Sequence, residues 1–79
     1  MNRQQVMEKA NTVFCNIFDD EDIVISDDTT SADIEDWDSL EQINILVALE
    51  KLFSIKFAVS EVEGLKNVGE MIDLIISKL

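Results

Sequence analysis

The feature that most limits the fold is the placement of helix-capping pairs along the chain. In this pattern an Asn, Asp, Ser or Thr precedes a Glu or Gln by three residues, which marks the first turn of a helix. The matching pairs are Asn2/Gln5, Asp38/Glu41, Ser39/Gln42, Ser60/Glu63 and Asn67/Glu70. The second and third pairs compete for one start, and the chain has no proline and only two glycines. The sequence therefore predicts an all-α fold with four helix starts.

Apolar residues recur at helical spacing after each predicted start. The expected helices are 3–18, 39–53, a short 61–66 and 68–77. We expect the following side chains to face the core: Val6, Ala10, Val13, Phe14, Ile17, Ile45, Leu46, Leu49, Leu52, Phe53, Val62, Leu65, Val68, Met71, Ile72, Ile75 and Leu79. The apolar IVIS stretch at 23–26 is short and has no partner strand. We therefore predict an all-α four-helix bundle, with three main helices and a short third one.

A long acidic segment separates the first two predicted helices. Residues 19–38 contain ten acidic residues and no basic one, whereas the rest of the chain has seven acidic and six basic residues. Loops of this length in compact domains are often functional. We expect a solvated loop with apolar anchors at Ile23, Val24, Ile25, Ile34 and Trp37.

Size and composition narrow the functional class. The 79 residues suit a single domain, 1–79. A net charge of −11 disfavours nucleic acid and anionic membranes as partners and favours basic proteins. No apolar run approaches the roughly 20 residues of a membrane span, and MNRQQVMEKA lacks the apolar stretch of a secretory signal. We therefore expect a cytoplasmic monomer.

Few residues suit catalysis or metal binding. The chain has no histidine, and its one cysteine is Cys15. Cys15 falls opposite the core-facing side of its helix, so we expect it to be exposed and without a chemical role.

The helix predicted at 39–53 carries a second apolar stripe. Its core residues occupy one broad face, whereas Leu40 and Val47 point nearly the opposite way and Ile43 lies on the border. Glu41 and Glu50 flank this stripe. The stripe is either ordinary surface or a docking site for a partner.

Ser39 has two alternative roles at the start of this helix. If Asp38 is the N-cap, Ser39 is the first helical residue, and its free hydroxyl lies where a phosphate ester would meet the positive helix end. If Ser39 is itself the cap, its hydroxyl is occupied. Because capping serines are common, the residues alone favour the second role.

The Asp38-Ser39-Leu40 triplet, followed by a helix that ends in VALEKLF, resembles the acyl carrier proteins. The acidic loop with ISDDTTSADIEDWDSL, the short helix after FAVSEVE and the closing helix share that family's order and spacing, so the resemblance covers nearly the whole chain. It implies a carrier without catalytic activity of its own. A separate phosphopantetheinyl transferase would move 4'-phosphopantetheine from coenzyme A to Ser39. The sulfur of that arm, and not Cys15, would hold acyl groups as thioesters.

The resemblance also implies how partners are recognised. Such carriers present the second helix to basic patches on phosphopantetheinyl transferases, acyl-loading ligases or transferases, and synthases. The corresponding residues are Glu41, Ile43, Val47, Glu50, Glu35 and Asp36, with Asp38 and Leu40 of the motif. An acyl chain could lie between the second helix and the two that follow it. Its candidate lining is Ile43, Leu46, Val62, Leu65 and Val68, although residues of this kind are more often simply part of the core.

The chain departs from fatty-acid carriers near the motif. Asp36 stands where those carriers usually have a glycine, and Gln42 and Asn44 replace acids that are frequent on their second helix. Lys51 adds a base. The changes favour a specialised stand-alone carrier in fatty-acid, polyketide or related biosynthesis. A peptidyl or D-alanyl carrier is the alternative.

Two hypotheses belong to other classes of protein. The loop acids suggest a divalent-cation binder, but residues 19–38 lack the glycine that an EF-hand loop requires. The second hypothesis is an unmodified helical adaptor that binds partners through Leu40 and Val47.

Overall fold

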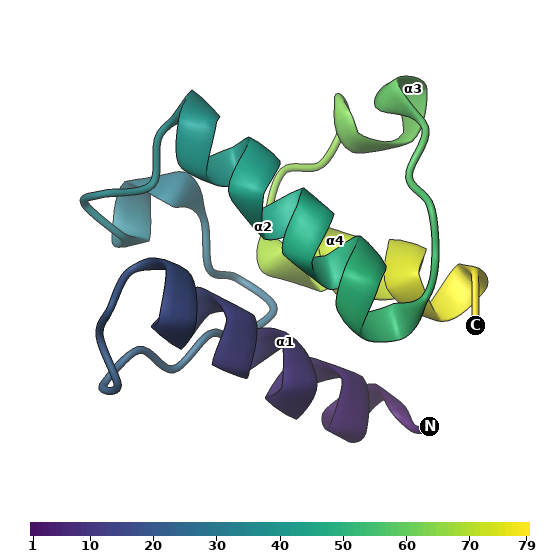
Figure 1. Cartoon of the computed structure of the whole chain (residues 1–79), viewed down its shortest axis with the longest axis horizontal. Helices are drawn as coiled ribbons and strands as arrows, with labels where there is room; N and C mark the ends of the chain where they lie inside the picture. The colour runs from purple at the N-terminus through teal and green to yellow at the C-terminus, as the bar shows by residue number, and fades with distance from the viewer.

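The computed structural model describes residues 1–79, and its regular elements are all helical. They are α1 (Arg3–Ile17), the 3₁₀ turn η1 (Ser31–Asp33), α2 (Ser39–Phe53), α3 (Val59–Val62) and α4 (Val68–Ser77). The predicted all-α bundle is confirmed. α1 packs against both α2 and α4, and the short α3 stands at the edge of the bundle (Figure 1). None of the helices combines the length and apolar character needed to traverse a bilayer.

The capping pairs place the main helices as predicted. Asn2 Oδ1 accepts a hydrogen bond from the Gln5 N–H, and Gln5 Oε1 accepts one from the Asn2 N–H, both at 2.9 Å. Asn67 Oδ1 accepts from the Glu70 N–H at 2.9 Å. Each carboxamide satisfies an N–H group that has no partner inside the first turn of its helix.

The predicted bounds of the short helix are wrong. α3 begins at Val59, so Ser60 lies inside the helix and is not its cap. Glu61 explains the earlier start, because its Oε1 accepts from the Ala58 N–H at 2.8 Å and from Lys78 Nζ at 2.9 Å. A contact with the far end of the chain therefore overrides the local pattern.

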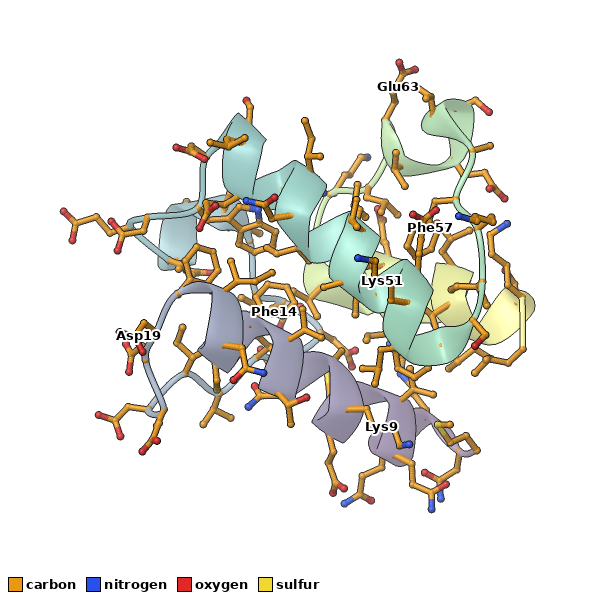
Figure 2. The ribbon with its side chains drawn as sticks, in the orientation of Figure 1. Lys9, Phe14, Asp19, Lys51, Phe57 and Glu63 are labelled. Atoms are coloured by element: carbon orange, nitrogen blue, oxygen red, sulfur yellow. The ribbon has the colours of Figure 1, made fainter.

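Thirteen buried apolar residues form the core. They are Val6, Ala10, Val13, Phe14, Ile25, Ile45, Leu49, Phe53, Ile55, Val68, Met71, Ile72 and Ile75. Figure 2 shows Phe14 between α1 and α2. The core prediction is wrong for Leu52 and Leu79, which are 43% and 55% exposed. Leu79 lies beyond the end of α4, and Leu52 lies on the flank of α2, which packs mainly against α1.

Asn11 on α1 fastens the first half of the acidic loop. Its Oδ1 accepts from the Ile25 N–H at 2.8 Å, and its Nδ2 donates to the Ile23 carbonyl at 3.0 Å. Ile25 is buried and Ile23 packs against the core, so the side chain of Val24 between them points the other way. Val24 is consequently 84% exposed, and its prediction as an anchor is wrong. Cys15 is half-buried beneath the loop, 3.4 Å from the Ile23 carbonyl, so its predicted exposure is also wrong.

The second half of the loop is fastened to the start of α4. The Val68 N–H donates to the Thr29 carbonyl at 2.8 Å, and the Gly69 N–H donates to the Asp27 carbonyl at 2.9 Å. A Cβ on Gly69 would lie 2.9 Å from that Asp27 oxygen, so only glycine permits this approach. Arg3 bonds the Asp27 carboxylate and also Asp73, and these hydrogen bonds raise the pKa of its guanidinium.

Candidate functional site

Asp38, and not Ser39, caps α2. Asp38 Oδ1 accepts from the Glu41 N–H at 2.9 Å, and the Asp38 carbonyl accepts from the Gln42 N–H at 2.9 Å. Ser39 is the first residue of the helix and is exposed. Its hydroxyl makes no hydrogen bond within the protein, so the capping role that the residues alone favour for Ser39 is wrong. The serine instead offers a free hydroxyl to solvent.

The start of α2 suits an anion. The helix has 15 residues, and its aligned peptide dipoles place partial positive charge at this end. The N–H groups of Ser39 and Leu40 have no acceptor within the protein. The Asp38 carboxylate and carbonyl accept instead from the N–H groups of Glu41 and Gln42. A phosphodiester on the Ser39 oxygen would lie beside both N–H groups. The residues present therefore fit a phosphate-linked group.

Trp37 secures this helix start to the core. Its Nε1 donates to Gln42 Oε1 at 2.7 Å, which links the residue before the cap to the first turn of α2. Its ring meets Phe14 edge-on, with centroids 5.2 Å apart. The sequence suggested Gln42 only as a capping partner of Ser39 and as the replacement of an acid. The need of a half-buried indole for an acceptor could have indicated its role.

A cleft of about 600 Å³ opens beside Ser39. It lies between the end of the acidic loop, the first turns of α2 and the segment 65–67 that leads into α4. Its polar lining is Thr30, Ser31, Asp38, Ser39, Gln42, Lys66 and Asn67. Its apolar lining is Trp37, Ile43, Leu65 and Met71. A group attached to the serine can therefore turn back against a mixed polar and apolar surface.

The structure divides the residues predicted to line an acyl pocket. Ile43 and Leu65 line the cleft, whereas Leu46, Val62 and Val68 do not. Val68 is fully buried in the core beneath the acidic loop, because its N–H is bonded to that loop. Leu46 and Val62 are half-buried outside the cleft.

The second apolar stripe of α2 lies at the surface. Leu40, Ile43 and Val47 are 65%, 58% and 42% exposed, so Ile43 belongs to this stripe rather than to its border. No other helix covers them, and they begin one residue after Ser39. An exposed apolar row of this kind on a helix can contact a partner protein.

The acidic residues around this stripe differ in their exposure and in the hydrogen bonds that their carboxylates make. Glu35 and Asp36 are exposed in the loop. Glu41 is half-buried and accepts from Asn44 Nδ2 at 2.8 Å. Glu50 is also half-buried, and its Oε2 accepts from the Phe57 N–H at 2.8 Å, which fixes the connection between α2 and α3. The Glu50 carboxylate therefore has a structural task of its own.

The loop carboxylates serve separate structural contacts. Asp27 pairs with Arg3, Asp33 Oδ2 accepts from the Thr30 N–H at 2.8 Å, and Asp38 caps α2. No group of three or more His, Cys, Asp or Glu side chains is arranged to hold a metal ion.

Comparisons with known proteins agree on one family. Residues 9–75 match the family described as "Phosphopantetheine attachment site". The chain is 25% identical to acyl carrier proteins of Thermosynechococcus vestitus and Guillardia theta, each over 79 residues, or 100% of this chain and 98% of the relative. It is also similar to the solution NMR structure of holo acyl carrier protein from Geobacter metallireducens. That match has a TM-score of 0.87 and 41% identity, and covers 92% of this chain and 84% of the other.

Proposed function

Because this chain belongs to the acyl carrier protein family, whose members carry acyl groups on 4'-phosphopantetheine without catalysis of their own, we propose that Ser39 bears that group. One observation carries the proposal. The Asp38 carboxylate caps α2, which leaves the Ser39 hydroxyl exposed at the first helical position with no internal hydrogen bond. No other residue of the motif offers a nucleophile there.

In the transfer reaction the carrier itself contributes only the Ser39 hydroxyl. Ser39 Oγ forms a bond to the phosphorus next to pantetheine in coenzyme A, and adenosine 3',5'-bisphosphate leaves. The serine proton passes to a base of the transferase, since the hydroxyl contacts no base in this chain. When attached, the group supplies a thiol that holds acyl groups as thioesters. The N–H groups of Ser39 and Leu40 stabilise the phosphodiester, and tethering raises the cargo's effective concentration at a docked enzyme.

The test is the mass of the intact protein after incubation with coenzyme A, Mg²⁺ and a broad-specificity phosphopantetheinyl transferase. We expect one phosphopantetheine adduct on the wild type and none on Ser39→Ala. Ser60→Ala is the matched control, because Ser60 is also exposed near the start of a helix, and it should load normally. An unmodified wild type, or an adduct that persists on Ser39→Ala, would reject the proposal and leave the unmodified adaptor.

The surface around Ser39 supports a docking role. Leu40, Ile43 and Val47 supply exposed apolar contact, and Glu41 and Asp36 supply negative charge around them. We infer that the partners are the phosphopantetheinyl transferase, an acyl-loading ligase or transferase, and synthases, each with a basic patch. Glu35 and Glu50 would add further negative charge to this docking surface. Glu50 is a poor probe, since its replacement would also free the Phe57 N–H.

Charge reversal at Glu41 tests this docking surface. Glu41→Lys should slow loading by the transferase, and the loss should shrink at high salt because screening weakens the charge pair. Glu63→Lys is the control, since Glu63 is exposed on the far side of α3 (Figure 2). Equal losses in both variants, or a loss at Glu41 that salt does not change, would contradict electrostatic docking at this face.

The pathway proposal rests on the departures near the motif. Asp36, Gln42 and Lys51 alter the surface that fatty-acid enzymes meet, so we propose a specialised carrier in fatty-acid, polyketide or related biosynthesis. Residues 1–79 would act as one carrier domain in the cytoplasm. The domain would be a monomer, because a net charge of −11 opposes self-association. A peptidyl or D-alanyl carrier is the alternative. Loading assays with acyl-activating and aminoacyl-activating ligases would distinguish the two classes.

A further inference from the structure

A second cleft opens at the end of α2 that is far from Ser39. It has a volume of about 440 Å³ and lies where the last turns of α2 meet the segment that leads to α3. Its lining is Val47, Glu50, Lys51, Ser54, Ile55 and Lys56. Val47 also belongs to the exposed apolar stripe, so this cleft is continuous with the proposed docking surface.

The cleft contains two lysines that have no ion-pair partner. Lys51 and Lys56 are both exposed and form no salt bridge, whereas Arg3 and Lys78 are paired with carboxylates. Lys51 lies in the last turn of α2, where a cation also interacts favourably with the negative end of the helix. Lys56 lies beyond the helix, so the same interaction does not explain its place in the cleft.

The other polar groups leave the cleft positively charged. Its one carboxylate, Glu50, accepts from the Phe57 N–H at 2.8 Å and forms no salt bridge with either lysine. The exposed hydroxyl of Ser54 makes no hydrogen bond within the protein. Two ammonium groups and one carboxylate give this lining a net positive charge, on a chain whose net charge is −11. The cleft therefore offers hydrogen-bond donors and positive charge to a carboxylate.

The charge changes sign along the exposed face of α2. Lys51 follows Val47 by four residues and so extends the apolar stripe by one helical turn. Figure 2 shows its side chain in front of the α2 ribbon. Glu41, near the start of the helix, is about 15 Å from Lys51 at the helical rise of 1.5 Å per residue. Because this separation exceeds the Debye length of about 8 Å at physiological salt, a partner meets two separate charged ends rather than their average.

We propose that Lys51 and Lys56 select partner proteins that carry exposed carboxylates beside their basic patch. This inference rests on the proposed docking surface of α2. The basic patch of the partner pairs with Asp36 and Glu41, an apolar side chain covers Val47, and an Asp or Glu pairs with the two lysines. A partner that is basic over its whole docking surface brings like charges together at the lysines and binds more weakly.

The surroundings favour a protein partner over a free anion or a second copy of this chain. Two exposed lysines hold a small anion weakly, and the net charge of −11 repels it. The same charge opposes self-association. A protein partner also gains the apolar contact with the stripe, which a free anion lacks.

The experiment uses two synthetic helical peptides of identical composition, each with 15 residues like α2. Both have leucines along one face and blocked termini. The bipolar peptide has two lysines at one end and two glutamates at the other, whereas the mixed peptide has one of each at both ends. Since both peptides are neutral, the net charge of the protein favours neither. Each is titrated into the isotope-labelled full chain, and the affinity is measured from backbone amide NMR shifts.

We expect the wild type to bind the bipolar peptide about fivefold more tightly than the mixed peptide, which is the effect of two exposed ion pairs. The preference should shrink at high salt because screening weakens the charge pairs. A nitroxide attached beside the glutamates should broaden the amide signals of Ser54 and Lys56 and spare that of Glu41. A nitroxide beside the lysines should do the reverse.

Charge reversal tests the role of the lysines. The double variant Lys51→Glu/Lys56→Glu should abolish the fivefold preference, and Lys51→Gln/Lys56→Gln, which adds no carboxylate beside Glu50, should reduce it. Lys9→Glu is the matched control for Lys51→Glu, because Lys9 is exposed on α1 (Figure 2) and the two variants change the net charge equally. The Lys9 variant should keep the preference and the Lys51 variant should lose part of it. Far-UV circular dichroism verifies that each variant is folded.

The outcomes separate this inference from the proposed function. Equal affinity for the two peptides, no binding of either at millimolar concentration, or a preference that persists in the double glutamate variant would overturn the inference. Saturable shifts of the Ser54 and Lys56 amides with inorganic phosphate alone would assign the cleft to a small anion, and self-association through it would assign it to a second copy; both would also overturn the inference. Loading of Ser39 is measured separately by mass, so all of these results leave the carrier function intact. A protein that prefers the bipolar peptide but cannot be loaded would reject the carrier function and leave an adaptor with this docking surface.

Discussion

Replacement of Gly69 by alanine tests how the acidic loop is held in place before α2. Gly69 is the second residue of α4, and its N–H donates to the Asp27 carbonyl at 2.9 Å. In isolation, alanine is the better helix residue, so helix propensity predicts a more stable protein. The close approach of the loop predicts the opposite.

The magnitude follows from the contact distances. An alanine Cβ would lie 2.9 Å from the Asp27 carbonyl oxygen and 3.0 Å from the Asp27 Cβ, so the loop backbone must move. That movement weakens two hydrogen bonds from the start of α4 to the loop, each worth about 1 kcal/mol. Overpacking costs about 1–3 kcal/mol more. The higher helix propensity of alanine offsets about 1 kcal/mol of this loss. We expect Gly69→Ala to lower the free energy of unfolding by about 3 kcal/mol, against a total of about 4–12 kcal/mol for a chain this long.

The assay is urea unfolding followed by far-UV circular dichroism and by Trp37 fluorescence. Gly64→Ala is the matched control, because no atom lies within 4 Å of a Cβ built there, and it should change stability by less than about 0.5 kcal/mol. In thermal unfolding, Gly69→Ala should lower Tm by about 15 °C. If Gly69→Ala is as stable as Gly64→Ala, the loop does not hold its place through this contact.

Three further predictions concern single side chains. Asn11→Ala should cost about 2 kcal/mol in urea unfolding, because it removes hydrogen bonds to two loop backbone groups, whereas the exposed Asn16→Ala should be neutral. Ser54→Gly should raise the free energy of unfolding in urea by about 0.5–1 kcal/mol, since Ser54 ends α2 at φ 56°; a lower free energy would refute this reasoning. Lys78 and a backbone N–H hold the pKa of Glu61 below its ordinary 4.5, so the stabilisation is present above that pH and is lost as pH falls through the lowered pKa. The stability difference between wild type and Glu61→Gln should therefore shrink below pH 4.5.

The sequence predicts what depends on neighbouring residues and misses what depends on distant ones. Asn2 and Asn67 could be predicted as caps because their partners lie three residues away. The pair that begins with Ser60 fails, since Glu61 bonds a lysine from the last turn of the chain. Asn11 gives no local pattern that predicts its role, because the two backbone groups that it bonds belong to the loop.

The same distinction applies to the candidate site. The exposure of Leu40 and Val47 could be predicted from helical spacing within α2. The cleft could not, because its lining comes from three separate segments and the position of segment 65–67 depends on how the loop meets α4. The hydrogen bond of Glu50 could not be predicted either, because its partner is the backbone N–H of Phe57, which the type of a side chain does not indicate.

The choice between the two overlapping capping pairs shows how a distant contact leaves the Ser39 hydroxyl free. If Ser39 were the cap, Gln42 would be the residue whose side chain reaches back to the serine N–H. That oxygen is already taken by the indole of Trp37, whose ring is held against Phe14 in the core. The Asp38 carboxylate is then left to cap α2, and Ser39 moves one position into the helix with its hydroxyl unengaged. The Gln42 carboxamide therefore fixes the helix start through its oxygen, and Gln42 also lines the cleft beside Ser39, so the fold and the proposed site depend on the same residue.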